Sequence, residues 1–199
     1  MPRAVLALIV SRRQLAEIAK IFSGMPVKSD LLVVIGRGIP VLTVGSIEGG
    51  GVEASLSLPA ELSVQATPRY QVLAGDLLLS ARSTSLKVAI VPPELDGAVI
   101  ASTLLGVRSR PRLAPAVLAA YLLSSEGQAA LEATCQSGSV QMNLTASALA
   151  KLEVPVPSPA EQEELVELLA ASDAAYHTAL AVAESRRQVV AQLVSNKLR

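Results

Sequence analysis

The last forty residues of this 199-residue chain contain neither glycine nor proline. They follow the segment Pro155-Val-Pro-Ser-Pro159, in which Ser158 can cap a helix, Pro159 suits the first helical position and Glu161 can complete a capping box. Acids gather near the beginning of the stretch and bases near its end, as the helix dipole favours. The pattern predicts one continuous helix over residues 158–199, about 60 Å long at ~1.5 Å per residue.

An apolar stripe with heptad-like spacing runs along this predicted helix, and alanine dominates its middle part. Small side chains let two helix backbones approach closely, which is typical of a coiled coil. Intrinsic propensity alone stabilises so long a helix poorly, so we expect the stripe to pack on a helix of another chain. Packing across the chain's own domain is the alternative. The interface residues selected by this hypothesis are Leu165, Leu169, Tyr176, Ala179, Ala183, Val190 and Val194.

Residues 1–157 have a different pattern, in which short apolar runs alternate with glycine, proline and serine. We expect a separate domain of mixed α+β class that is rich in strands. Strands are predicted at 4–10, 31–35, 41–44, 52–56, 76–80, 87–91 and 98–104, with a hairpin turn at Gly49-Gly50-Gly51. Helices are predicted at 11–20, 115–124, 125–135 and 146–149, the third opened by a capping box at Ser125-Glu-Gly-Gln128.

Composition excludes several classes of protein. Apolar residues make up 51 % and aromatic residues 2 %, so the chain can bury a sizeable core that is aliphatic. Seventeen bases balance seventeen acids, which excludes binding to nucleic acid by bulk charge but not by a local basic face. The single Cys135 permits no internal disulfide and fits the reducing cytoplasm. No run approaches the ~20 apolar residues of a membrane helix, so we expect no membrane partner.

The sequence shows no convincing catalytic constellation. A nucleophile–histidine–acid triad would have to use His177, the one histidine, which lies midway along the predicted helix. The carboxylates are mostly single or belong to a solvated face of that helix. One histidine and one cysteine do not make a metal cluster. We therefore predict a chain that is not an enzyme by itself and uses no metal or cofactor.

The main positive signal is a basic segment over residues 69–112, with six bases and three acids. Its sequence Arg82-Ser-Thr-Ser85, with Lys87 close behind, offers a guanidinium fork for guanine or phosphate and hydroxyls for phosphate. Arg108 and Arg110 add a second cationic patch. A pair of solvated turns is the alternative, and charge alone does not decide between them.

A further segment, Gln141-Met-Asn143-Leu-Thr145, carries two amide side chains. Glutamine and asparagine can read an adenine edge in the major groove through two hydrogen bonds. Asn143 and Thr145 could equally cap the short helix predicted at 146–149, so both interpretations stay open.

Several segments, in this order, resemble the type I restriction–modification specificity subunits. A strand pair of that family is similar to the runs Gly75-Asp-Leu-Leu-Leu-Ser80 and Lys87-Val-Ala-Ile-Val91. A further motif of the family is similar to Tyr121-Leu-Leu-Ser-Ser-Glu-Gly-Gln128. The run from Gly138 through Gln141-Met-Asn-Leu-Thr145 to Val154-Pro-Val-Pro157 looks like the end of a target-recognition domain entering the family's spacer helix. Each motif is degenerate, but their order and spacing are fairly specific and cover nearly the whole chain.

The resemblance implies a non-catalytic DNA-recognition subunit. In that family one domain reads half of a bipartite site, and two spacer helices pair antiparallel and dock methyltransferase subunits. Members usually carry two domains and two helices, whereas this chain has one of each. It therefore resembles a half-subunit that homodimerises through residues 160–199 and reads a two-fold symmetric, interrupted site. The implied partners are double-stranded DNA, a second copy, a methyltransferase subunit and, in a restricting system, the restriction subunit.

DNA contacts cannot be transferred from the family motifs, because recognition domains vary most where they touch bases. The contacts that we predict rest on side-chain chemistry. They are Arg82, Ser83, Thr84 and Lys87, then Gln141 and Asn143, then Arg37, Arg108 and Arg110. The alternative function is a protein–protein scaffold or regulatory subunit of a methyltransferase complex that does not read DNA.

Overall fold

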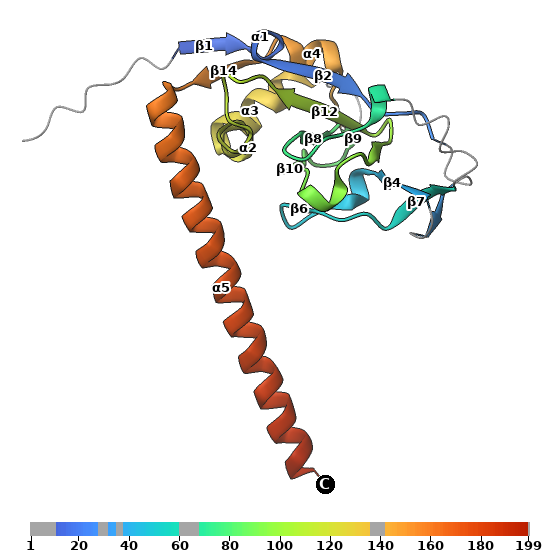
Figure 1. Ribbon diagram of the computed structural model, residues 1–199, viewed down its shortest axis with the longest axis vertical. Coiled ribbons are helices and arrows are strands. Elements are labelled where there is room, and N and C mark those ends of the chain that lie inside the picture. Colours follow the sequence, from blue (N-terminus) through green and yellow to red (C-terminus); the bar gives the residue numbers. More distant parts are fainter. Residues whose placement is uncertain (1–10, 28–31, 35–37, 60–67, 136–141, 199) are drawn as a thin grey trace, which may run out of the picture. The chain divides into compact units, whose positions relative to one another are not determined.

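The chain divides into two compact units, Met1–Pro159 and Ala160–Arg199. A computed structural model describes residues 11–27, 32–34, 38–59, 68–135 and 142–198 (Figure 1). The first unit, called the head below, is a strand-rich α+β domain, and the second belongs to one helix, α5 (Pro159–Lys197). The predicted fold class is confirmed. In the described segments, none of the helices has the length and apolar character needed to span a bilayer.

A four-stranded antiparallel sheet lies at the centre of the head (Figure 1). All residues of its inner strand β8 are buried, which explains the unbroken leucine run Leu77-Leu78-Leu79. Helix α2 (Pro115–Leu123) contacts the sheet at the strand β10. The order of strands across the sheet is β10 (Val88–Ile90), β8 (Leu77–Ser80), β12 (Leu104–Ser109) and β2 (Ala19–Ser23).

A second four-stranded sheet shares its core with the first. Its order is β11 (Val99–Ile100), β4 (Gly38–Leu42), β7 (Leu56–Pro59) and β3 (Val33–Val34), with β11 and β4 parallel and the other pairs antiparallel. Successive side chains of a strand point to opposite faces. Leu42 and Ile100 accordingly join a cluster that contains Leu78 of the central sheet, whereas Val41 and Val99 join a second cluster.

The predicted turn at Gly49-Gly50 is confirmed as the turn of a hairpin between β5 (Ile47–Glu48) and β6 (Gly51–Val52). Both glycines have positive φ angles, 58° and 82°, which a two-residue turn of this type requires at both positions. Among the described residues, short 3-10 segments lie at η2 (Val44–Ser46), η4 (Pro68–Tyr70) and η5 (Pro93–Leu95).

Three predicted helices of the head are confirmed: α2, α3 (Ser125–Thr134) and α4 (Ala146–Ala150). The cap of α3 is Ser124, one residue before the predicted Ser125, and its Oγ accepts a hydrogen bond from the Gly127 amide at 3.1 Å. Thr145 caps α4, since its Oγ1 accepts from the Ala148 amide at 3.2 Å. Capping is therefore the role that the structure gives Thr145.

The helix predicted over 11–20 is wrong apart from one turn. Residues Ser11–Gln14 form β1, which pairs antiparallel with β14 (Glu153–Val156), then α1 (Leu15–Ile18) makes a single turn and β2 starts at Ala19. Pairing with a distant strand satisfies the backbone groups that a local helix would have satisfied, and it overrides the local capping signal.

Some predicted strands also differ in detail. The run 98–104 belongs to two strands, because β11 ends at Ile100 and β12 begins at Leu104. The run 52–56 likewise spans the end of β6 and the start of β7. The strand predicted at 4–10 lies outside the described residues.

Candidate nucleic-acid interface

A two-stranded ribbon brings together two of the segments predicted to contact DNA. It consists of β9 (Arg82–Ser83) and β13 (Met142–Asn143), and its register places Asn143 opposite Arg82. The Leu144 amide donates to the Ala81 carbonyl at 2.8 Å and extends the pairing at one end. Three predicted contacts, Arg82, Ser83 and Asn143, are therefore neighbours in space although far apart in sequence.

The ribbon presents chemistry suited to base edges. The Arg82 side chain is exposed and Asn143 is half-buried, while the adjacent Thr84 is exposed. Within the residues that the structure describes, no carboxylate forms an ion pair with Arg82. Directly opposed residues of an antiparallel pair have Cβ atoms about 5 Å apart, so Arg82 and Asn143 can reach the same or adjacent base pairs. Arginine suits guanine, asparagine suits adenine, and a two-stranded ribbon fits the major groove.

Lys87 lies in the same hairpin as Arg82 but turns to the protein's own backbone. Its ammonium Nζ donates to the Ile47 carbonyl at 2.7 Å and to the Val44 carbonyl at 3.3 Å. The side chain is half-buried. The structure thus gives Lys87 a framework contact that the sequence did not predict.

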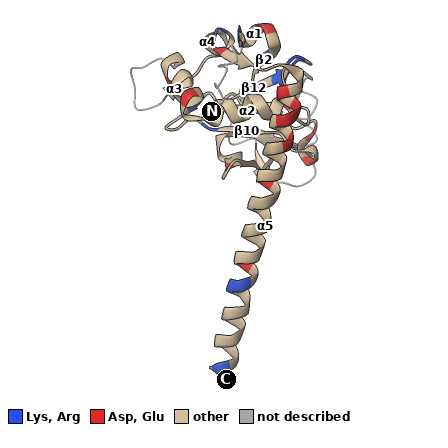
Figure 2. Ribbon diagram, turned by 90° about the vertical axis from the view of Figure 1, so that its left-hand side faces the viewer, with Lys and Arg blue, Asp and Glu red and all other residues tan. Residues whose placement is uncertain are grey.

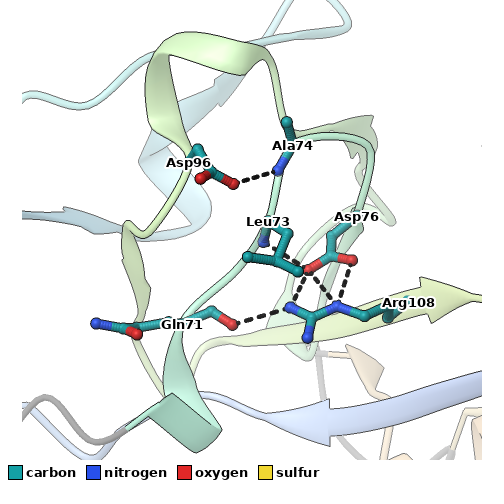
Figure 3. Close-up of polar contacts among 6 residues, drawn as sticks. All are labelled: Gln71, Leu73, Ala74, Asp76, Asp96 and Arg108. Carbon is teal, nitrogen blue, oxygen red and sulfur yellow. Dashed lines mark hydrogen bonds and ion pairs between the residues drawn. The ribbon is translucent and has the colours of Figure 1, made fainter.

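Arg108 is held by a buried carboxylate (Figure 3). Its Nε lies 2.9 Å from Oδ1 of Asp76 and its Nη2 lies 2.7 Å from Oδ2, while Nη2 also donates to the Gln71 carbonyl at 3.2 Å. The Asp76 side chain is 3 % exposed and also accepts from the Leu73 amide at 2.8 Å. Hydrogen bonding to Asp76 raises the pKa of Arg108 above its usual value, against the opposing effect of burial.

The two basic patches predicted from the sequence lie at opposite ends of the central sheet. Ser80 pairs with Leu104 and Leu77 pairs with Val107, so the end of β8 that leads to Arg82 is remote from the end of β12 that carries Arg108. Arg110 belongs to this second end, where its Nη1 donates to the Glu17 carbonyl at 3.0 Å. The other two predicted contacts, Arg37 and Gln141, lie outside the described residues.

Helix α5 presents the side chains that were predicted to face a partner helix. Tyr176 and Val190 are each 59 % exposed, and Val194 is 52 % exposed. Ala179 and Ala183 are exposed, Leu165 is just exposed at 37 % and Leu169 is half-buried. Along α5 itself, acidic residues mark the beginning and basic residues the last turns (Figure 2).

Sequence reasoning missed a second apolar row on α5 and two buried polar residues of the head. Leu168, Val182 and Val189 lie at heptad spacing beside the predicted stripe and are exposed. The heptad count along the helix could have found this row. Asp76 holds Arg108, a partner that is distant in sequence, and Ser80 holds groups of Ser85 and Lys87 across a hairpin loop.

Comparison with known proteins identifies the fold. No family model and no curated protein sequence matches the chain. A solved structure concerned with complex assembly and conformational transition of the type I R-M system contains a chain that matches with a TM-score of 0.65 and 21 % identity, over 93 % of this chain and 45 % of that one. The HsdS subunit from Thermoanaerobacter tengcongensis matches with a TM-score of 0.56 and 22 % identity, over 86 % of this chain and 39 % of the subunit.

The type I restriction-modification S subunit from M. genitalium gives a similar match, with a TM-score of 0.57 and 16 % identity over 87 % of this chain and 42 % of the subunit. This chain has the fold of half a type I specificity subunit. The resemblance stated from the sequence is confirmed at the level of the fold. This chain spans less than half the length of each of these three proteins.

Proposed function

We propose that this chain is a non-catalytic, half-length specificity subunit of a type I restriction–modification system that acts in the cytoplasm. Residues 1–157 would be its target-recognition domain and residues 158–199 its spacer and dimerisation helix. The match of 93 % of the chain to a chain of a type I R-M structure carries the proposal. The ribbon of β9 and β13, which combines an exposed arginine with an asparagine, supports a role in reading bases.

We place the base-reading contacts of this proposal on the ribbon and its loop, at Arg82, Ser83, Thr84 and Asn143. Arg108 and Arg110 then serve the framework, because each donates to a group of the protein itself. Since the chain as a whole carries no net charge, phosphate contacts from methyltransferase subunits would supply much of the affinity for double-stranded DNA.

The proposed dimer forms between two α5 helices in antiparallel orientation. The acids near the start of one helix would then face the bases near the end of its twin, as the charge gradient of Figure 2 favours. Ala179 and Ala183 lie in the middle part of the stripe, where their small side chains allow a close approach. Two recognition domains related by a two-fold axis would read a symmetric, interrupted site.

Methyltransferase subunits would dock on the part of α5 that the twin helix leaves uncovered. The row Leu168, Val182 and Val189 lies beside the dimer stripe and supports this assignment, because its exposed apolar surface fits a further helix. A restriction subunit would join through the methyltransferase in a complete system.

Methylation mapping tests the function directly. The methyltransferase encoded beside this chain should methylate DNA at one interrupted, two-fold symmetric sequence when the chain is present, and at no such sequence when it is absent. Assembly of the two proteins without any site preference would contradict DNA recognition and favour the scaffold function.

The oligomeric state tests the dimer. Light scattering on the purified chain should give the mass of two copies, and Val190→Asp on the apolar stripe should give one copy. Gln188→Asp, on the polar side of the same helix turn, is the matched control and should leave the dimer intact. A monomeric wild-type chain at high concentration would remove the symmetric-site proposal.

A further inference from the structure

The segment between β8 and β10 is a hairpin loop, residues 81–86, that contains β9 and so carries Arg82. Ser80, at the end of β8, is 1 % exposed and ties the two ends of this loop together. Its Oγ accepts from the Lys87 amide at 2.9 Å and donates to the Ser85 carbonyl at 3.3 Å. The Ser80 amide also donates to the Lys87 carbonyl at 3.0 Å. One buried hydroxyl therefore closes the base of the loop.

Lys87 anchors the same loop to a different part of the head. Its Nζ donates to the carbonyls of Val44, the first residue of η2, and of Ile47, the first residue of β5. The Val44 carbonyl also accepts from the Ile47 amide, so Lys87 adds a second donor to this turn. The Lys87 side chain thus fixes the loop against the β4–η2–β5 segment.

The loop is held on one side by the pairing of β9 with β13 and by the Ala81 amide, which donates to the Thr103 carbonyl at 2.8 Å. Thr84 and Ser85 are exposed, and Arg82 points its charge to solvent. Contacts that read bases must be held within roughly 0.5 Å of the productive geometry to be selective. The anchors at the base of the loop, together with the pairing of β9 with β13, are therefore the groups that can set where Arg82 and Thr84 lie.

We propose that Ser80 and Lys87 are positioning residues, which fix the loop 81–86 and thereby the specificity of Arg82, without touching DNA themselves. This inference rests on the proposed function of the ribbon. It also changes the role of Lys87 from the phosphate contact that its charge alone predicts to an anchor of the reading loop.

The two roles of Lys87 have opposite signatures in DNA binding. A phosphate contact contributes to the affinity for every sequence, and its removal lowers the slope of log Kd against log salt concentration by about 1. A positioning residue leaves that slope unchanged, and its removal reduces the preference for the correct sequence over a scrambled one. Ser80 separates the roles further, because a hydroxyl that is 1 % exposed cannot reach a phosphate.

The experiment compares Lys87→Met, Ser80→Ala and the control Lys20→Met, which removes an exposed lysine of β2. Each full-length variant is assembled with a methyltransferase subunit of such a system and titrated, over a range of salt concentrations, with a duplex selected from a random pool by the wild-type complex and with its scrambled counterpart. Hydrogen exchange of the amides of residues 81–86 is measured without DNA in the same variants.

We expect Lys87→Met and Ser80→Ala each to lower discrimination about tenfold, within the range of one bidentate base contact, with an unchanged salt slope and faster exchange in the loop. Lys20→Met should keep both discrimination and exchange. A lower salt slope with full discrimination in Lys87→Met, or unchanged loop exchange in both variants, would overturn the proposal. Should the wild-type chain select no duplex when it is assembled with a methyltransferase subunit, the proposed function fails, and the exchange measurement alone decides whether Ser80 and Lys87 fix the loop.

Discussion

The central sheet carries an arginine at each end, and the two are used differently. At one end Arg108 is 32 % exposed and donates to a carboxylate, Asp76, that is almost completely buried. Beyond the other end Arg82 is exposed on a two-stranded ribbon beside Asn143. The difference shows that a basic run in a sequence does not by itself mark a binding surface. Arg108 is held by a buried carboxylate that the fold places within reach of its guanidinium.

This comparison predicts the largest effect for Arg108→Ala, because it would leave the buried Asp76 without its counter-charge. We expect the free energy of unfolding to fall by about 3 kcal/mol, measured by urea denaturation, and Arg82→Ala serves as the control with a change within ~0.5 kcal/mol. Pairing raises the pKa of Arg108, so this stabilisation is present below the ordinary arginine pKa and is lost only as the pH rises through the raised value. The loss in Arg108→Ala should therefore be the same at neutral and mildly alkaline pH. Equal stabilities of the two variants would remove the distinction between the two ends.

The second effect concerns DNA rather than stability. Arg82→Ala should reduce discrimination at one base position by roughly 1–3 kcal/mol, as expected for a bidentate contact with guanine. Competition binding with duplexes that vary one base pair at a time measures it. Equal weakening on every duplex would instead make Arg82 a phosphate contact.

A smaller effect tests the pairing inside the ribbon. Because Asn143 lies opposite Arg82, the two substitutions to alanine should couple by about 1 kcal/mol in the free energy of DNA binding, as residues in contact do. Arg110 lies at the other end of the sheet, so Arg82→Ala and Arg110→Ala should add within ~0.5 kcal/mol. If the changes in binding free energy add for both pairs of substitutions, Arg82 and Asn143 do not act as one unit.

The smallest effect is predicted for Arg110→Ala. Its guanidinium donates to the Glu17 carbonyl on the surface and forms no ion pair with a carboxylate of the described residues, so the free energy of unfolding should fall by about 0.5 kcal/mol. Thermal denaturation of Arg110→Ala and Arg108→Ala under the same conditions compares the two losses of stability. A loss as large as that of Arg108→Ala would show that burial of the partner is not what separates these two arginines.

The elements that the sequence predicted well are those with local signals. Helix α5 follows from forty residues without glycine or proline, and the β5–β6 turn from adjacent glycines that both adopt positive φ. Helices α2, α3 and α4 each begin at or within one residue of the predicted start. In all of these the backbone hydrogen bonds are closed by residues nearby in sequence.

The features that the sequence did not predict depend on distant partners. The segment Ser11–Gln14 carries a helix-start signal but pairs with β14 at the far end of the head. In the sequence, Arg82 and Arg108 are both basic residues, and nothing near Arg108 identifies its partner Asp76. The two side chains come into contact only because β8 pairs with β12. For the candidate site, the sequence predicted which residue types are suited to contact DNA. It did not predict which of them lie together on the ribbon and which bind the protein's own groups, because strand register decides this.

The pairing of β1 with β14 has a consequence for how such heads can be combined. Ser11 lies opposite Val156, so the first described residue of the head and its last strand lie side by side. A domain with adjacent entry and exit points can be spliced into a longer polypeptide as a cassette, since its interior contacts do not involve the junction. Exchange or duplication of such heads between long helices would therefore require recombination only at the two ends of this strand pair.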